Sequence, residues 1–183
     1  MTYPIKLAKT YIKSDLFRYT GSTSTSKFLS QYLTNRSFKY SFWLRLANVS
    51  SVIIRVPSIL IHKYLSNKYS IQIGRTTPIG HGLYIAHHMC IVMNKTVTIG
   101  SNCNISQFLT IGSNNGKAAI IGNNVYIGPN VCLVENIVIG DNVTIGAGSV
   151  VTHDIPPNCT AVGNPARVIS QKNPGRYIIN KWE

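Results

Sequence analysis

From Ile71 onward, aliphatic residues recur along the chain at intervals of six. The longest unbroken series is Ile121, Ile127, Leu133, Ile139, Ile145 and Val151. Two earlier series have the same interval: Ile73, Ile79, Ile85 and Ile91, and then Ile99, Ile105 and Ile111. A period of six suits neither an α-helix, with about 3.6 residues per turn, nor a free strand, with a period of about 2. It predicts a solenoid of short strands and tight turns, in which one aliphatic side chain per rung points inward.

The breaks in this repeat are also informative. Each rung buries little apolar surface alone, so the stacking of neighbouring rungs stabilises a solenoid and keeps them in register. Ile111 and Ile121 are ten residues apart, and the excess falls in Ser113–Ala119, which is polar and contains glycine. We therefore expect Ser113–Ala119 to leave the coil as a loop, where functional residues tend to lie.

The first 70 residues have apolar side chains at helical spacing instead. The three groups are Phe28, Leu29, Tyr32 and Leu33; Phe38, Phe42, Trp43 and Leu46; and Val49, Val52, Ile53 and Val56. Ser37 is a candidate N-cap for the second helix, and Pro57 is expected to end or kink the third. Thr20–Ser26 is typical of a turn or linker. The chain thus divides into a helical region (1–70), a solenoid (71–170) and a C-terminal tail (171–183).

The helical region is strongly basic. It has 11 Lys and Arg residues against Asp15 alone, a formal charge of +10 out of +13 for the whole chain. Such a surface can face nucleic acid, an anionic membrane or an acidic substrate. No nucleic-acid-binding motif accompanies the charge, so we expect no nucleic acid. Peripheral membrane contact, contact with an acidic glycan and a merely solvated basic surface all stay open.

We expect a cytoplasmic protein that can also lie at the inner face of the membrane. No signal sequence opens the chain, and the longest apolar stretch, Val49–Leu65, is too short and too polar to span a bilayer. The four cysteines contain no CxxC pair, so we expect reduced, mostly buried thiols and no disulfide scaffold or zinc site.

The repeat and several local motifs resemble the hexapeptide-repeat acyltransferases, and within them the serine acetyltransferase branch. The matching segments are Ile79–Asn94 (IGHGLYIAHHMCIVMN), Ile99–Gly112 (IGSNCNISQFLTIG), Ile121–Gly128 (IGNNVYIG), Ile145–Val151 (IGAGSVV) and Val162–Ile169 (VGNPARVI). Asp15–Gly21 (DLFRYTG) and Phe38–Leu46 (FKYSFWLRL) look like the N-terminal region of members tied to capsule or surface-polysaccharide synthesis. The resemblance implies a left-handed parallel β-helix after a short helical region, a homotrimer with sites between subunits, acetyl-CoA as co-substrate and no metal.

Moving an acetyl group from a thioester to a hydroxyl needs a base that removes the hydroxyl proton as the oxygen attacks. Histidine suits this task because its unperturbed pKa lies near neutrality. By the resemblance, His87 holds the position of the family's catalytic histidine, the third residue of the rung that starts at Ile85. His88 is a candidate supporting residue.

Three positions depart from the serine acetyltransferase pattern. Ala86 replaces the aspartate that precedes the catalytic histidine, and Gln72 replaces the aspartate that orients its imidazole. The Arg-His pair that grips an amino-acid carboxylate is missing from the loop at 113–119. Three groups are candidates for orienting His87: the Gln72 side-chain carbonyl, a backbone carbonyl and Asp15. Without these ionic contacts free serine should be a poor acceptor, and a neutral sugar hydroxyl fits better.

The resemblance also implies where coenzyme A binds. Small residues and exposed backbone groups would line the pantetheine arm, at Gly112, Ser113, Gly128, Pro129, Ala147 and Gly148. Arg167, with Lys172 nearby, is the candidate for the adenosine phosphates, because a guanidinium can bind phosphate through two hydrogen bonds.

We therefore predict an acetyl-CoA-dependent O-acetyltransferase that acts on a hydroxyl of a sugar or polysaccharide precursor, with His87 as general base. Two alternatives remain: a serine O-acetyltransferase of cysteine biosynthesis, and a non-catalytic β-helix that serves as a scaffold.

Overall fold

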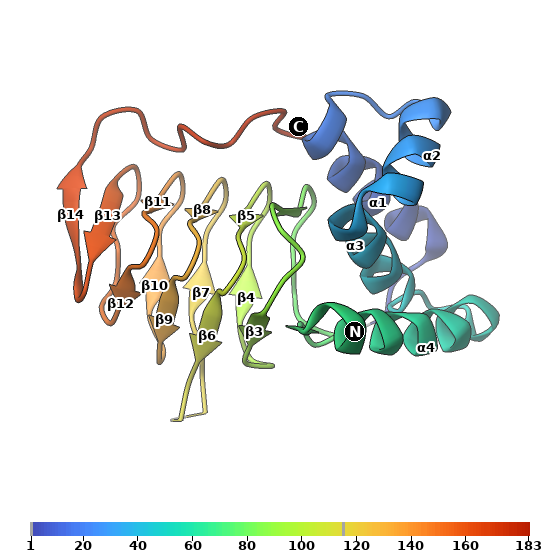
Figure 1. The fold of residues 1–183 in the computed structure, drawn as a ribbon, viewed down its shortest axis with the longest axis horizontal. Coiled ribbons are helices and arrows are strands. Elements are labelled where there is room, and N and C mark those ends of the chain that lie inside the picture. Colours follow the sequence, from blue (N-terminus) through green and yellow to red (C-terminus); the bar gives the residue numbers. More distant parts are fainter. Residues whose placement is uncertain (1, 115) are drawn as a thin grey trace.

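The computed structural model describes residues 2–114 and 116–183, and it contains the predicted solenoid (Figure 1). Three sheets form its sides. The five-stranded sheet has the order β1 (Ile71–Gln72), β3 (Ile91–Met93), β6 (Thr110–Gly112), β9 (Cys132–Val134) and β12 (Val150–Val151). The three-stranded sheet consists of β4 (Thr98–Ile99), β7 (Ile120–Ile121) and β10 (Val138–Ile139). The six-stranded sheet runs β2 (Tyr84–Ile85), β5 (Asn104–Ile105), β8 (Tyr126–Ile127), β11 (Thr144–Ile145), β13 (Thr160–Gly163) and β14 (Ala166–Ser170). The fold is a left-handed parallel β-helix, as predicted.

The six-residue repeat sets the register of the coils. Ile85, Ile105, Ile127 and Ile145 pair in sequence across the six-stranded sheet, and each has an exposed fraction of 0%. Full burial of an isoleucine side chain stabilises a fold by about 1.5–3 kcal/mol. One inward aliphatic per rung therefore accounts for the stack. The last pair, β13 with β14, is antiparallel and closes the far end of the solenoid.

Asparagines occupy the turns that lead into the six-stranded sheet. Asn102, Asn124, Asn142 and Asn158 all have a positive φ, between 55° and 61°. Asparagine tolerates this left-handed conformation better than most residues. Their side chains also form a ladder, because the Asn124 amide donates to Asn142 (3.0 Å) and the Asn142 amide donates to Asn158 (2.9 Å).

Four helices gather at one end of the solenoid (Figure 1). They are α1 (Ile5–Thr20), α2 (Thr25–Thr34), α3 (Arg36–Leu46) and α4 (Val52–Tyr69). One sequence prediction is wrong, and one of the two outcomes predicted for Pro57 is excluded. Asn35, and not Ser37, caps α3, because its side-chain oxygen accepts the Phe38 N–H (3.1 Å). Pro57 lies inside α4 and does not end it, since the helix continues to Tyr69.

Helix α1 covers the open edge of strand β2, the first strand of its sheet. The Ser14 hydroxyl accepts the Gly82 N–H, and the Asp15 carboxylate accepts the Leu83 N–H, both at 2.8 Å. The Tyr19 hydroxyl accepts the Ile85 N–H (2.9 Å) and donates to the Ile85 carbonyl (3.0 Å). These side chains replace the hydrogen bonds that a preceding coil would make, so the edge is not left unpaired.

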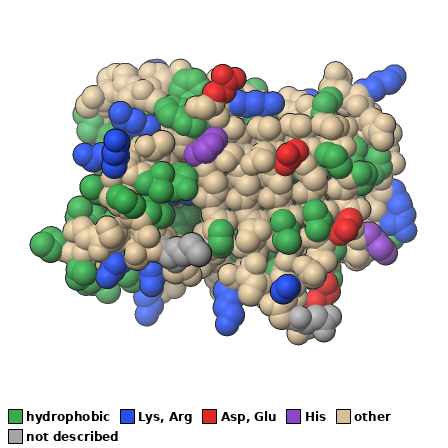
Figure 2. All heavy atoms as spheres, turned by 180° about the vertical axis from the view of Figure 1, so that it is seen from behind, with side chains coloured by type: hydrophobic (Ala, Val, Ile, Leu, Met, Phe, Trp, Pro, Cys, Tyr) green, Lys and Arg blue, Asp and Glu red, His purple; other side chains and the backbone are tan. Residues whose placement is uncertain are grey.

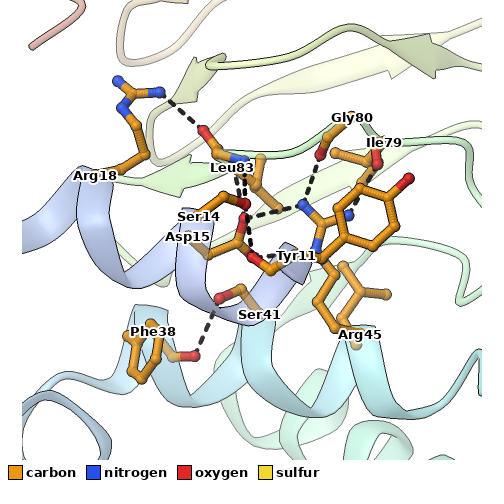
Figure 3. Close-up of polar contacts among 12 residues, drawn as sticks. Tyr11, Ser14, Asp15, Arg18, Phe38, Ser41, Arg45, Ile79, Gly80 and Leu83 are labelled. Atoms are coloured by element: carbon orange, nitrogen blue, oxygen red, sulfur yellow. Dashed lines mark hydrogen bonds and ion pairs between the residues drawn. The ribbon is translucent and has the colours of Figure 1, made fainter. Parts of the chain in front are cut away.

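A buried ion pair fixes α1 and α3 onto the same coil (Figure 3). Arg45 binds both carboxylate oxygens of Asp15 at 3.0 Å, and both side chains are almost completely buried. The remaining Arg45 donors reach the carbonyls of Ile79 (2.8 Å) and Gly80 (2.7 Å). Because each of the three guanidinium nitrogens has an acceptor, this pair sets the geometry between the helices and the first coil.

The C-terminal segment runs back along the six-stranded sheet to the helices (Figure 1). The Asn104 amide donates to the Tyr177 carbonyl (3.1 Å), and the Arg18 guanidinium donates to the Ile179 carbonyl (2.9 Å). The Trp182 ring packs edge-on against Phe17, with centroids 5.6 Å apart. The predicted tail is thus a cover for one side of the solenoid.

Two further expectations concern cysteines and membrane spans. The four cysteines are free; Cys103 and Cys159 are buried, whereas Cys90 is exposed. None of the helices in the described ranges combines the length and apolar composition needed to cross a bilayer.

Candidate active site

The turns that lead from the six-stranded to the five-stranded sheet stack along one edge of the solenoid. We call this the histidine edge; it comprises residues 86–90, 106–109, 128–131 and 146–149. Backbone hydrogen bonds connect its turns, from the Phe108 N–H to the Met89 carbonyl (3.2 Å) and from the Gly148 N–H to the Pro129 carbonyl (2.8 Å). The edge is therefore a rigid, straight line of backbone.

His87 lies in the first turn of the histidine edge, and its side chain is exposed. The turn is held on both sides, because the Ala86 N–H donates to the Ile105 carbonyl (2.9 Å) and the Met89 N–H donates to the His87 carbonyl (3.0 Å). No hydrogen bond to the His87 ring forms within the described residues. A fixed backbone with an accessible imidazole is suited to proton transfer with a bound molecule.

His88 is half-buried beside His87 and packs against the end of α4. Its ring lies edge-on to Tyr69, with centroids 4.9 Å apart. Burial lowers the pKa of His88, and the positive charge of Arg36 and the proximity of His87 lower it further. A neutral His88 at pH 7 is consistent with the supporting role predicted for it.

Two of the other histidines have structural contacts. His62 is buried and its Nε2 lies 3.0 Å from the Tyr40 hydroxyl, and burial lowers the pKa of His62 to about 4. His153 contacts the adjacent Thr152 hydroxyl at 2.8 Å. Within residues 2–114 and 116–183, no three His, Cys, Asp or Glu side chains come together as a metal site.

The hypothesis that Asp15 orients His87 is wrong. Asp15 has an exposed fraction of 0%, and its oxygens accept hydrogen bonds from Arg45 and the Leu83 N–H instead. Gln72 is exposed on β1, in register with Val92 of β3, and stays a predicted orienting group. Asp15 supports the coil that carries His87 without touching the histidine.

Most other acidic side chains are also bound within the chain. Glu135 accepts a hydrogen bond from the Ser113 hydroxyl (2.9 Å). Asp141 and Asp154 each accept a backbone N–H, at 2.6 and 2.7 Å. Glu183 is the exposed last residue. The described acidic residues therefore form no hydrogen bond with His87.

A cavity of about 620 Å³ opens on the outer side of β1 and β3, beside the first turn of the histidine edge. We call it the β1 cavity. Its polar lining comes from Ser66, Asn67, Ser70, Gln72 and Lys95, and Cys90 connects it to the turn of His87. Its lining contains no acidic residue among those described. The sequence did not indicate Ser66 and Asn67 as cavity residues, because polar residues at the end of a helix usually face solvent.

Four of the residues predicted to bind coenzyme A lie on the histidine edge: Gly128, Pro129, Ala147 and Gly148. Ala147 and Gly148 are exposed, and a Cβ built on Gly148 would meet no atom within 4 Å. Gly128 is different, since its Cβ would lie 2.8 Å from the Ala147 nitrogen. Coil packing alone thus explains Gly128, whereas Ala147 and Gly148 offer open backbone.

Gly112 and Ser113 lie at the opposite edge of the five-stranded sheet, at the end of β6. The structure does not bring them to the histidine edge of the same chain, because a three-residue strand of about 10 Å intervenes. A Cβ on Gly112 would meet nothing within 4 Å, and its φ is not positive. The described residues of one chain therefore give no reason for glycine at position 112.

Arg167 and Lys172 belong to the last coil. Arg167 is exposed on β14 and donates only to the neighbouring Ala166 carbonyl (3.0 Å), and Lys172 is exposed just beyond it. Four strand spacings separate β2 from β13, a distance of about 19 Å. The two cations are thus at the far end of the solenoid from His87.

These features define a left-handed β-helix of the hexapeptide class, with an exposed histidine on a rigid backbone edge. Residues 118–153 match the family model described as bacterial transferase hexapeptide (six repeats). A soybean serine acetyltransferase structure superposes with a TM-score of 0.74 at 30% identity, covering 88% of this chain and 69% of that one. The chain belongs to the hexapeptide-repeat acyltransferase family.

Curated relatives include both amino-acid and sugar acetyltransferases. Mitochondrial serine acetyltransferase 3 of Arabidopsis thaliana is 36% identical over 65% of this chain and 32% of its own length. The galactoside O-acetyltransferase of Escherichia coli K12 is 41% identical over 55% of this chain and 56% of its own length. The chain thus spans about a third to just over half of these relatives. The similarity to capsule-related members stays a prediction.

Proposed function

We propose that the protein transfers an acetyl group from acetyl-CoA to a hydroxyl, with His87 as the general base. The observation that carries the proposal is an exposed histidine on the same straight edge as the open backbone at Ala147 and Gly148. His87 takes the proton from the hydroxyl while that oxygen attacks the thioester carbonyl. The carbon–sulfur bond then breaks, and the thiolate takes up the proton, so an ester and a free thiol result.

The coenzyme would lie along the histidine edge, from His87 toward the last coil. A pantetheine arm is a chain of amides, and the exposed backbone of Ala147 and the carbonyl of Gly148 can pair with it, since the Gly148 N–H already donates to Pro129. Arg167 and Lys172 would meet the phosphates, since their charges have no acidic partner in the described hydrogen bonds. This arrangement leaves the side of His87 that faces the helices for the acceptor.

We further propose a homotrimer in which each site is formed between two subunits. Gly112 supports this proposal, because it lies at the next edge, away from the His87 of its own chain, and a Cβ added there would meet no described atom within 4 Å. A neighbouring subunit can bring that edge to the histidine edge. The missing side chain at Gly112 then gives room for the coenzyme or for the neighbour's backbone.

The proposed acceptor is a sugar hydroxyl in a glycan or its precursor. The β1 cavity supports this, because all its polar side chains except Lys95 are neutral: Ser66, Asn67, Ser70 and Gln72. Such groups hydrogen-bond hydroxyls well. The ammonium group of serine would find no carboxylate in this lining, and an unpaired charge is costly to desolvate.

L-serine is the second candidate acceptor. The relatives favour it over a sugar, because both the Arabidopsis and the soybean proteins are serine acetyltransferases. The galactoside O-acetyltransferase of Escherichia coli is the relative that favours a sugar. A non-catalytic scaffold is the weakest alternative, because a scaffold does not require an exposed histidine at position 87.

A panel of acceptors separates these candidates. Thiol release from acetyl-CoA should be followed with L-serine, simple glycosides, nucleotide sugars and a purified glycan, and the ester product identified by mass. We expect faster turnover with a sugar than with L-serine. Saturable formation of O-acetylserine at sub-millimolar serine would establish the amino acid as the acceptor. Absence of thiol release with every acceptor would contradict the acetyltransferase proposal itself.

A further inference from the structure

A second hollow, of about 520 Å³, lies between the start of α3 and the turn that carries His87. We call it the α3 hollow. Its lining residues are Gln31, Thr34, Asn35, Arg36, Ser37, Ala86 and His88. Ala86 and His88 flank His87 directly, so whatever occupies this hollow lies beside the reacting group. The hollow is on the helical side of His87, opposite to the coils with Ala147 and Gly148.

The first turn of α3 presents unpaired backbone donors to this hollow. The Asn35 side chain accepts the Phe38 N–H (3.1 Å), which uses the third helical N–H. The N–H groups of Arg36 and Ser37 have no hydrogen-bond partner within the described residues. The positive end of the dipole of an 11-residue helix adds to these donors. Such a helix start favours an anion.

The Ser37 hydroxyl is a separate indication. Ser37 has an exposed fraction of 2%, it lines the hollow, and its hydroxyl forms no hydrogen bond with any described residue. The residue is buried except where it borders the hollow, so a hydrogen-bond partner for its hydroxyl has to come from that side. A ligand oxygen in the hollow would supply that partner.

Arg36 completes the set of donors. A cation in the first turn of a helix is unfavourable next to the positive end of the dipole, and Arg36 forms no ion pair within the described part of the chain. In Figure 2 the helical end, on the left, carries several basic side chains. An anion at the α3 hollow would remove this unfavourable arrangement.

We propose that the α3 hollow binds a carboxylate or phosphate of the acceptor, so that the acceptor is an acidic sugar. Arg36 binds the anion, with the N–H groups of Arg36 and Ser37 and the Ser37 hydroxyl as further donors. The proposal rests on the proposed function, because it assigns the anion to the acceptor of His87. Coenzyme phosphates are excluded by position, since the cations proposed for them lie at the other end of the solenoid.

The test compares two acceptors that differ at C6: methyl β-D-glucuronide has a carboxylate there, whereas methyl β-D-glucoside has a neutral hydroxymethyl group. Arg36→Gln should raise the KM for the glucuronide by about 10- to 100-fold, the range for losing a charge-assisted hydrogen bond. The KM for the glucoside and for acetyl-CoA should stay within about twofold of wild type, and Arg36→Lys should restore part of the loss. Ser37→Ala should raise the glucuronide KM by a smaller factor. Lys63→Gln, an equal loss of charge on the exposed face of α4, is the matched control.

A direct binding measurement keeps this test independent of turnover. Glucuronide and inorganic phosphate are titrated, without acetyl-CoA, into the wild type, Arg36→Gln and Lys63→Gln. The affinity for both anions should be lower in Arg36→Gln than in the wild type, and unchanged in Lys63→Gln. Equal affinities, or a KM that changes no more than in Lys63→Gln, would overturn the proposal. Sensitivity to Arg36→Gln with L-serine instead of the glucuronide would assign the anion to an amino acid and overturn the acidic sugar. Binding without any acetyl transfer would contradict the proposed function alone.

Discussion

His87 combines a fixed backbone with an exposed side chain. The turn around it forms hydrogen bonds to the next coil through Ala86 and closes on itself through Met89. The imidazole itself packs into no core, so its removal should cost little folding energy. A substitution of His87 should therefore affect activity without affecting the stability of the fold.

We expect His87→Ala to lower acetyl transfer by about 10²–10⁴-fold, the range for losing a general base. The free energy of unfolding should be nearly unchanged. Steady-state thiol release and thermal unfolding of the purified variant measure the two effects. Turnover near the wild-type rate would remove His87 from the mechanism and direct attention to His88, which His88→Ala would then test.

At the scale of elements, α1 acts as the missing first coil of the solenoid. The outer N–H and carbonyl of Ile85 would be unpaired at the edge of the six-stranded sheet, and the single hydroxyl of Tyr19 binds both. Burial raises the pKa of Tyr19, which keeps it protonated and able to donate. The strand that leads into His87 is therefore held by a helix and not by another strand.

Tyr19→Phe should destabilise the protein by about 1–3 kcal/mol, because it leaves a buried N–H and a buried carbonyl of Ile85 without a partner. Urea unfolding followed by fluorescence or circular dichroism gives the free energy change. Tyr64→Phe, on the exposed face of α4, is the control and should have little effect. If the two variants unfold alike, α1 does not cap the edge in the way described.

At the scale of the whole molecule, one chain holds only part of the proposed site. His87 and Gly148 lie on one edge, and Gly112 lies on the next. The five-stranded sheet between them is too wide for a small acceptor to bridge. A closed assembly that brings two edges together resolves this, and a cyclic trimer suits a three-sided solenoid.

We expect light scattering to give a particle with three times the chain mass. Gly112→Val should leave the unfolding free energy unchanged, because the added side chain meets no atom of its own chain, while it raises the KM for acetyl-CoA or weakens the trimer. Gly128→Val is the contrasting variant; it should destabilise folding, since its Cβ would lie 2.8 Å from the Ala147 nitrogen. A monomer with full activity would contradict the shared site.

The local sequence determined the solenoid, because the same six-residue pattern recurs in every rung. An aliphatic residue at every sixth position, as at Ile127 and Ile145, must point inward in each rung, and nothing farther along the chain alters that requirement. The same regularity revealed the break at 113–119. His87 could be predicted as the general base because it stands at a set place in a rung of this repeat and matches a family motif.

Only the tertiary structure decided how the helices meet the solenoid and what lies around His87. Tyr19 and Ile85 are 66 residues apart, and Asp15 and Arg45 are 30 apart, so no local pattern links them. Asp15 does not orient His87, because it is buried in an ion pair with Arg45 that no local pattern indicates. Arg36 and Ser37 become a candidate anion site only because folding sets the start of α3 against the turn of His87. Contacts between distant segments depend on packing, which a local repeat does not encode.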